Sequence, residues 1–175
     1  SIGDPEKDVL NIVRNNKKYI IKTQNNINIY NAGMVDNLDN VPYPNWSKYN
    51  LSKYDGKLYL VASKSCSYNK CTFCDERLIW GNRFRIRNYK NIVDEIRYDI
   101  LNYNINNFFF WDASITAYPY LEELCEEIIN EKINCKWTAL IRADEITDEL
   151  ARLMKNAGCY SIEIGIESLN DDILR

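Results

Sequence analysis

From residue 57 onward, short apolar runs alternate with amphipathic stretches, and this alternation limits the fold more than any other feature of the sequence. The apolar runs predict strands, and the stretches between them have the spacing of helices. The expected strands are 57–63, 106–112, 134–141 and 159–167, and the expected helices are 88–103, 118–131 and 147–158. Repeats of about 25–30 residues of this kind predict an α/β fold with a parallel sheet and right-handed crossovers. About four β/α units are half of an eightfold barrel, so we expect the N-terminal half of a (β/α) barrel or an open doubly wound sheet.

Local signals indicate where the helices begin and end. Thr147 has the hydroxyl oxygen that an N-cap needs, and Gly158 is expected as the C-cap of the same helix. Pro119 is expected in the first turn of its helix, where a missing N–H costs nothing. The helix at 88–103 is expected to have one apolar side, formed by Ile92, Val93, Ile96, Ile100 and Leu101.

The first 56 residues have a different character. Residues 4–15 predict a short helix, and two strands are expected at 18–23 and 27–32. Pro42 and Pro44 disfavour both helix and central strand, which predicts an extended linker. Three parts are therefore expected, namely a small α+β tail of an upstream domain at 1–40, the linker at 41–56 and a core domain at 57–175. Because the chain starts without Met and stops in what resembles the first turn of a helix, we expect a fragment of a longer protein.

The overall charge argues against two classes of function. The net charge is −3 and the isoelectric point is about 5.1, whereas general binders of nucleic acid or membrane surfaces are normally basic. No uninterrupted apolar run approaches the roughly 18 residues of a membrane span, and the N-terminus lacks the layout of a signal peptide. We therefore expect a cytoplasmic protein whose clustered thiols serve metal or redox chemistry.

Three of the six cysteines, Cys66, Cys71 and Cys74, lie in the loop after the first expected strand. Loops at the carboxyl ends of parallel strands carry the active residues of α/β folds, so these thiols are candidate metal ligands. Thiolates are the usual ligands of a 4Fe–4S cluster, and three of them would leave one iron open to another ligand. Zinc normally takes four ligands, and the sequence has no histidine. There are two alternatives. One is a zinc site completed by a distant cysteine, and the other is that the thiols are free and bind no metal.

These residues resemble the radical S-adenosylmethionine (SAM) superfamily. Its hallmark is C-x3-C-x2-C with an aromatic residue before the last cysteine, in the loop after the first strand of a partial α/β barrel. The run from Cys66 to Cys74 matches in order, in place and at Phe73, and it departs by one residue in the first gap. The resemblance covers roughly residues 35–175. Within it, 37–51 and 142–168 are similar to the branch with an N-terminal cobalamin-binding domain.

The resemblance implies an activity. An open iron of a 4Fe–4S cluster would bind SAM, and reductive cleavage would yield a 5′-deoxyadenosyl radical that attacks a small-molecule or peptide substrate. An electron donor such as flavodoxin or ferredoxin is implied as a partner. A cobalamin-binding domain outside this chain would imply methyl transfer or a rearrangement. Two alternatives stay open: a methylthiotransferase-like enzyme acting on tRNA, and a zinc-stapled binding or scaffold module.

The resemblance also implies roles at the ends of the second and fourth strands. Within the cysteine loop, the aromatic side chains of Tyr68 and Phe73 would shield a cluster from water. Asp112 would accept a hydrogen bond from the methionine ammonium group, and Ser114 would bond nearby, unless either of them only caps a helix. Glu167 would contact the ribose or the methionine part, with Ser168 beside it. A salt bridge in the barrel interior is the alternative for Glu167.

At the end of the third strand, Arg142 is a candidate for a bidentate bond to a carboxylate. An ion pair with Asp144 or with another acid of the barrel is its alternative. Other polar or thiol residues have structural explanations. Cys125, Cys135 and Cys159 are expected to be structural thiols, the last two at strand starts. For Arg83, Arg85 and Arg87 we expect a solvated charged edge, with phosphate or a partner domain as the alternative.

Overall fold

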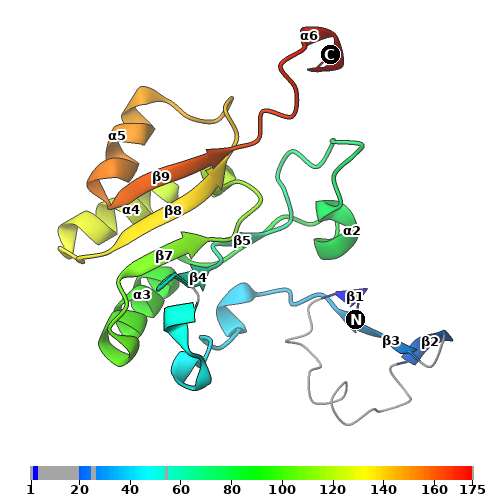
Figure 1. Cartoon of the computed structure of the whole chain (residues 1–175), viewed down its shortest axis with the longest axis horizontal. Coiled ribbons are helices and arrows are strands. Elements are labelled where there is room, and N and C mark those ends of the chain that lie inside the picture. The colour runs from blue at the N-terminus through cyan, green and yellow to red at the C-terminus, as the bar shows by residue number, and fades with distance from the viewer. Residues whose placement is uncertain (1, 4–19, 25–26, 54, 175) are drawn as a thin grey trace.

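Figure 1 shows the computed structural model, which describes residues 2–3, 20–24, 27–53 and 55–174. The helix predicted at 4–15 lies outside the described residues. The central element is a four-stranded sheet in the order β4-β7-β8-β9, in which each neighbouring pair is parallel. Its strands are β4 (Leu58–Leu60), β7 (Asn107–Phe110), β8 (Lys136–Ile141) and β9 (Cys159–Ile164). The predicted α/β fold with a parallel sheet is therefore confirmed.

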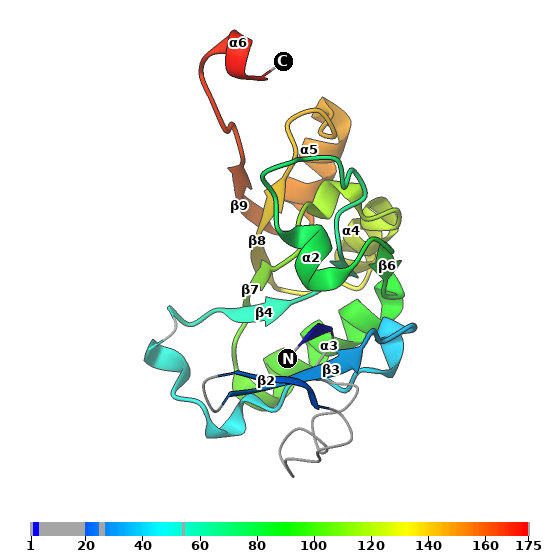
Figure 2. The same cartoon turned by 90° about the vertical axis from the view of Figure 1, so that its right-hand side faces the viewer.

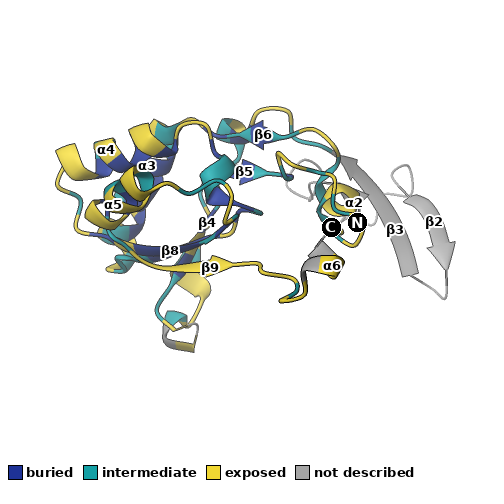
Figure 3. Cartoon of the chain, turned by 90° about the horizontal axis from the view of Figure 1, so that it is seen from above, coloured by how far each residue is buried: buried dark blue, intermediate teal, exposed yellow. Residues whose placement is uncertain are grey.

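Three helices connect the strands and cover one face of the sheet, as Figures 1 and 3 show. They are α3 (Tyr89–Tyr103), α4 (Leu121–Asn130) and α5 (Asp148–Asn156). Alternate strand residues point toward these helices and form the buried core, among them Leu58, Leu60, Phe108, Phe110 and Trp137. The rings of Phe110 and Trp137 pack edge to face at a centroid distance of 5.2 Å. The other face of the sheet carries more exposed side chains, which include Tyr59 and Trp111.

The apolar side of α3 differs in part from the expectation. Ile92, Val93 and Ile96 are buried, but Leu101 is 83% exposed. Leu101 follows Ile96 by five residues, which turns it about 140° around the helix axis. The buried positions of this side also include two acids, Glu95 and Asp99. The prediction was therefore wrong for Leu101 because it relied on residue type more than on helical angle.

The predicted helix ends are confirmed in part. The Thr147 hydroxyl accepts a hydrogen bond from the Leu150 N–H at 3.2 Å, as an N-cap should. The C-cap of α5 is Ala157, and Gly158 is one residue beyond it at φ +97°. A β-carbon at position 158 would lie 2.2 Å from the Cys135 carbonyl oxygen, so only glycine fits.

Pro119 is not in the first turn of α4, which begins two residues later at Leu121. A 3-10 turn, η6 (Ile115–Ala117), precedes it, and Tyr118 is extended at φ −72° and ψ 117°. A residue before proline is disfavoured from helical geometry, which explains the later start.

The N-terminal strands form a separate small sheet in the order β1-β3-β2. They are β1 (Ile2–Gly3), β2 (Ile20–Gln24) and β3 (Ile27–Gly33), so both strands predicted here are confirmed. A 3-10 turn, η3 (Leu38–Asn40), follows. The stretch predicted as an extended linker contains two more, η4 (Trp46–Lys48) and η5 (Leu51–Lys53). The Asn45 side chain accepts from the Ser47 N–H at 3.0 Å and starts the first of these two turns. None of the helices in the described part of the chain is long and apolar enough to cross a bilayer.

The prediction of a solvated edge in the arginine-rich stretch is confirmed for Arg83 and wrong for Arg85 and Arg87. Arg83 is exposed, but Arg85 and Arg87 are only 4% and 8% exposed. The strands β5 (Ser63–Lys64) and β6 (Arg85–Ile86) pair antiparallel, which brings this stretch against the core. The Arg85 guanidinium donates to the carbonyl oxygens of Val35 at 2.8 Å and Trp80 at 3.1 Å.

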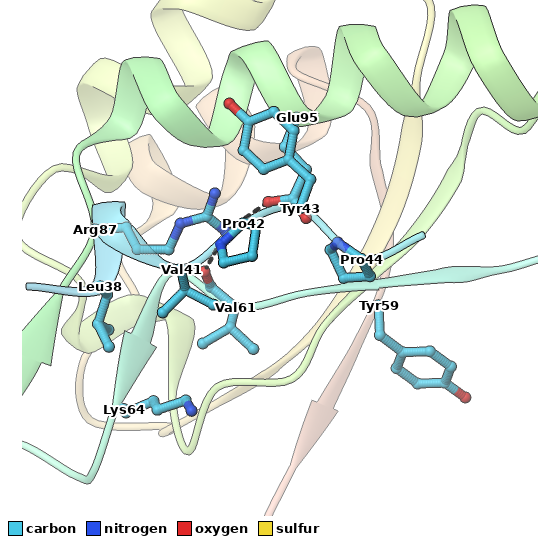
Figure 4. Close-up of a pocket in the computed structure, with 10 residues that line it drawn as sticks. All are labelled: Leu38, Val41, Pro42, Tyr43, Pro44, Tyr59, Val61, Lys64, Arg87 and Glu95. Atoms are coloured by element: carbon cyan, nitrogen blue, oxygen red, sulfur yellow. Dashed lines mark hydrogen bonds and ion pairs between the residues drawn. The ribbon is translucent and has the colours of Figure 1, made fainter. Parts of the chain in front are cut away.

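Arg87 lies between Tyr43, in the segment before the parallel sheet, and α3, with its guanidinium 6.0 Å from the Tyr43 ring centroid. Its guanidinium pairs with Glu95 at 2.6 Å and donates to the Val61 carbonyl at 3.0 Å. Figure 4 shows this pair beside Tyr43 among the residues that line a small pocket. The volume of this pocket is about 120 Å³. The Tyr43 hydroxyl donates to the Asn91 carbonyl of α3 at 3.1 Å. A polar seam of Tyr43, Arg87 and Glu95 therefore attaches the segment around Tyr43 to α3.

Candidate active site at the carboxyl ends of the strands

The three clustered cysteines open into one cavity of about 430 Å³ at the carboxyl ends of the sheet strands. The loop that carries them runs from β5 to the short helix α2 (Glu76–Trp80). Figure 2 views the molecule from this end, with α2 in the foreground. The cavity also takes in four of the other predicted site residues: Phe73, Asp112, Arg142 and Glu167. Its described lining does not include the remaining two, Ser114 and Ser168.

The cysteine loop is closed at its base. The backbone of Ser65 has a φ of +73°, and its hydroxyl donates to the Gly81 carbonyl at 2.7 Å. All three thiols are partly exposed. Among the described residues, no three side chains of the metal-binding types already stand in the arrangement of a metal site. The loop thus presents three accessible thiols to one cavity, but their sulfur atoms are not yet grouped around a common centre.

The other three cysteines lie away from this loop. Cys125 and Cys135 are buried, and Cys159 opens β9 at the opposite end of the sheet. Burial raises the pKa of Cys125 to about 12 and those of Cys135 and Cys159 to about 11. All three therefore form thiolates less readily and are poor metal ligands. The expectation that they are structural thiols fits this environment. A donor set of three thiols and no histidine suits an iron–sulfur cluster better than a four-ligand zinc site.

Asp112 lines the cavity, but its carboxylate is bonded inside the protein. Its Oδ2 accepts from the Ala62 N–H at 3.1 Å. Its Oδ1 accepts from the N–H and the hydroxyl of Ser63 at 2.5 and 2.6 Å. Burial raises the pKa of Asp112 to about 6, against the opposing effect of these hydrogen bonds. Asp112 thus ties the end of β7 to the end of β4, and the ammonium contact stays a prediction.

Arg142 forms the ion pair that was the alternative for it. Its guanidinium bonds Asp144 through Nε at 3.1 Å and Nη2 at 2.6 Å, and Nε lies 3.3 Å from Glu145 Oε1. The same guanidinium lies over the Tyr68 ring of the cysteine loop, 4.1 Å from its centroid.

Ser114 takes part in the same network and not in the cavity wall. Its hydroxyl and that of Thr116 each lie 2.8 Å from Glu145 Oε2, and the Ser114 oxygen accepts from the Arg142 N–H at 3.2 Å. Sequence reasoning missed Glu145. Its position three residues after Arg142 was the available signal.

Glu167 lies in the cavity wall just after β9. Its backbone has a φ of +61°, and a β-carbon at Gly165 would lie 3.0 Å from Glu167 Oε1. Gly165 therefore leaves room for the carboxylate. Ser168 instead accepts from the Asn170 N–H at 3.0 Å, in the turn before α6 (Asp171–Leu174).

Sequence reasoning also missed an aromatic wall on the open face of the sheet. The rings of Tyr59, Phe109 and Trp111 contact one another at centroid distances of 5.5 to 5.8 Å. Phe109 and Trp111 line the cavity together with Glu163. The alternation of residues along the strands, which sends every second side chain to this face, was the available signal.

Known proteins are similar to this chain in sequence and in fold. It is 34% identical over 127 residues to bacteriochlorophyllide d C-12(1)-methyltransferase of Chlorobaculum tepidum, a match that covers 70% of the chain and 27% of the relative. It is 32% identical over 154 residues to cytidylyl-2-hydroxyethylphosphonate methyltransferase of Streptomyces wedmorensis, covering 77% and 28%. The chain spans about a quarter to a third of the length of the curated relatives it matches.

A solved structure shares the fold. It is OxsB, a cobalamin-dependent S-adenosylmethionine radical enzyme with aqua-cobalamin and S-adenosylmethionine bound. The likeness has a TM-score of 0.75 at 19% identity and covers 98% of this chain and 28% of OxsB. The family model of the radical SAM superfamily matches residues 60–175, where the parallel sheet and the cysteine loop lie. The chain therefore belongs to the radical SAM superfamily.

Proposed function

We propose that this chain forms the first half of the catalytic domain of a radical SAM enzyme, most simply a cobalamin-dependent methyltransferase. The observation that carries the proposal is that Cys66, Cys71 and Cys74 share one cavity with Glu167 at the carboxyl ends of the strands. Two relatives that are over 30% identical have methyltransferase names, which supports methyl transfer as the net reaction. In this proposal residues 1–40 belong to an upstream domain, 41–56 to a linker and 57–175 to the core domain.

The three thiolates would hold a 4Fe–4S cluster and leave one iron for the amino and carboxylate groups of SAM. A reduced cluster of this kind supplies the electron that splits SAM into methionine and a 5′-deoxyadenosyl radical. The protein's part is to bind, to orient and to exclude water. Phe73, 67% exposed on the loop, would cover the cluster once a partner segment or ligand closes over it. The Glu167 carboxylate would accept from the ribose hydroxyls.

Asp112 and Ser114 would act mainly by fixing the strand ends, since both side chains are already bonded within the protein. Ser168 would contact SAM beside Glu167. A small-molecule substrate would enter over the aromatic wall, and a flavodoxin or ferredoxin would supply electrons. A cytoplasmic, reducing location belongs to the same proposal, and it is supported by six free cysteines.

Anaerobic reconstitution tests the cluster directly. We expect about four irons and four sulfides per chain and a brown colour, lost in the Cys66→Ala, Cys71→Ala, Cys74→Ala triple variant. Cys159→Ala is the matched control, because this thiol lies at the other end of the sheet, and it should keep the cluster. A colourless protein with one tightly bound zinc would favour the scaffold alternative instead. If the cluster forms, release of 5′-deoxyadenosine from SAM under reducing conditions would show that the protein is a radical SAM catalyst.

A further inference from the structure

The cysteine loop is held from outside by a residue that lies at the end of a different strand. Tyr68, two residues after Cys66, lies under the Arg142 guanidinium at 4.1 Å from ring centroid to Cζ. Arg142 comes directly after β8, so the contact joins the loop to the third strand of the sheet. A guanidinium over an aromatic face is attracted by the negative potential of the ring.

The guanidinium is itself held by a network on its other atoms. Asp144 binds it bidentately, but the Asp144 side chain is 68% exposed. Glu145 is the more buried partner at 24% exposure, and its second oxygen lies 2.8 Å from each of the hydroxyls of Ser114 and Thr116. Those hydroxyls belong to the segment after β7. The network therefore fixes Arg142 relative to two strand ends.

The charge of Arg142 also reaches the metal-binding thiols. Arg142 and the three cysteines line the same cavity. The hydrogen bond to Asp144 raises the pKa of Arg142, and the negative charges of Asp144 and Glu145 act in the same direction, so Arg142 stays cationic. The reduction potential of an iron–sulfur cluster depends on the surrounding charge, and a fixed cation favours the reduced, more negative state.

We infer that Arg142, held by Glu145 and stacked on Tyr68, is a positioning residue that keeps the cysteine loop in its cluster-binding shape and raises the reduction potential of the cluster. The inference rests on the proposed function, since it assigns no ligand other than the cluster. It gives Arg142 a role through Tyr68 that differs from the carboxylate contact expected for it.

The test measures how fast an iron chelator removes the cluster from the anaerobically reconstituted protein. We expect Arg142→Gln and Tyr68→Leu each to speed the loss by about fivefold, because each removes the same contact. The double variant should lose the cluster no faster than the faster single variant. Tyr68→Phe keeps the ring and should match the unaltered protein. Glu145→Gln should act in the same direction as Arg142→Gln with a smaller effect.

Two further measurements separate this role from a general loss of stability. The midpoint potential, followed by electron paramagnetic resonance, should be more negative in Arg142→Gln and less affected in Arg142→Lys, which keeps the charge. Arg152→Gln is the matched control, since Arg152 is a 73% exposed arginine on α5, and it should change neither quantity. Tyr68 is 42% exposed in its loop, so its variants leave the core intact.

The outcomes separate the two proposals. Unaltered cluster retention and potential in both Arg142→Gln and Tyr68→Leu would overturn this inference and leave the proposed function standing. Additive losses in the double variant would also overturn it, because two separate contacts would then be at work. An unaltered protein that binds no iron would overturn the proposed function, and this inference with it.

Discussion

At the scale of single residues, Asp99 is the clearest departure from ordinary packing. It lies on α3 with no exposed surface, and neither carboxylate oxygen has a partner among the described residues. Burial raises the pKa of Asp99 to about 7, and the nearby charge of Glu95 acts in the same direction. The folded state therefore favours the protonated form far more than the unfolded chain does.

Asp99→Asn should remove a pH dependence of stability. The folded pKa of about 7 lies above the value of 3.8 expected without burial, so the folded state binds more protons and stability falls as pH rises from about 4 to 7. Replacing the acid by its neutral analogue should stabilise the protein by roughly 1–3 kcal/mol at pH 8 and by much less at pH 5. Urea unfolding at the two pH values measures this.

Asp94→Asn is the control for that substitution, because Asp94 lies on the same helix with a 61% exposed side chain. It should show no comparable difference between the two pH values. A loss of stability at pH 8 in Asp99→Asn would contradict the argument and would mean that the ionised carboxylate has a favourable partner.

At the scale of elements, the turn from α5 to β9 depends on close backbone contact. Gly158 has a φ of +97° and approaches the Cys135 carbonyl, and its own carbonyl accepts from the Trp137 N–H at 3.0 Å. The buried indole of Trp137 in turn donates to the Ala157 carbonyl at 2.9 Å. This turn therefore sets the register of β9 against β8, and with it the position of Glu167 at the far end of the strand.

Gly158→Ala should destabilise the protein by about 3 kcal/mol or more, because its β-carbon would overlap a backbone oxygen that cannot move freely. Gly56→Ala is a matched comparison, since Gly56 has a φ of +61° but nothing within 4 Å of the added carbon. Its cost should be only about 1 kcal/mol, from the left-handed backbone alone. Equal costs in thermal unfolding would show that conformation, and not contact, decides at position 158.

At the scale of the whole molecule, the polar seam of Tyr43, Arg87 and Glu95 connects the segment before the parallel sheet to α3. Arg87 and Glu95 are both buried and paired at 2.6 Å, and the Tyr118 hydroxyl donates to the Arg87 carbonyl at 2.7 Å. Burial raises the pKa of Glu95, while the charge of Arg87 opposes that rise. The ion pair with Arg87 therefore lowers the cost of burying the ionised Glu95 carboxylate.

Arg87→Met should destabilise the protein by about 3–5 kcal/mol at pH 8, because Glu95 would be left buried without its partner. The double variant Arg87→Met, Glu95→Met should recover most of the loss, since no uncompensated charge remains. Arg83→Met, at a 71% exposed ion pair in the same stretch, should change stability by less than about 0.5 kcal/mol. Chemical denaturation of the unaltered protein and the three variants measures their free energies of unfolding. A double variant as unstable as Arg87→Met would contradict the argument that the unpaired Glu95 charge causes the loss.

The order and type of the elements could be predicted because they depend on local periodicity. The four strands from β4 to β9 and the helices between them follow from the spacing of apolar residues, which is read within one segment. The cysteine loop, Asp112, Arg142 and Glu167 were placed correctly near one cavity, because parallel strands bring their carboxyl ends to the same edge. Element boundaries could not be predicted as well, as Pro119 shows, since Tyr118 before it is extended and the helix begins only at Leu121.

The sequence by itself determined the α/β architecture, the location of the thiols and the family resemblance, because each of these is encoded by neighbouring residues. Only the tertiary structure decided which partner each polar side chain has. Asp112 bonds Ala62, which is 50 positions away, Arg85 and Arg87 turn inward, and Arg142 stacks on a tyrosine of another loop. Side-chain partners depend on which surfaces meet after the chain folds, and residue type alone does not specify that meeting.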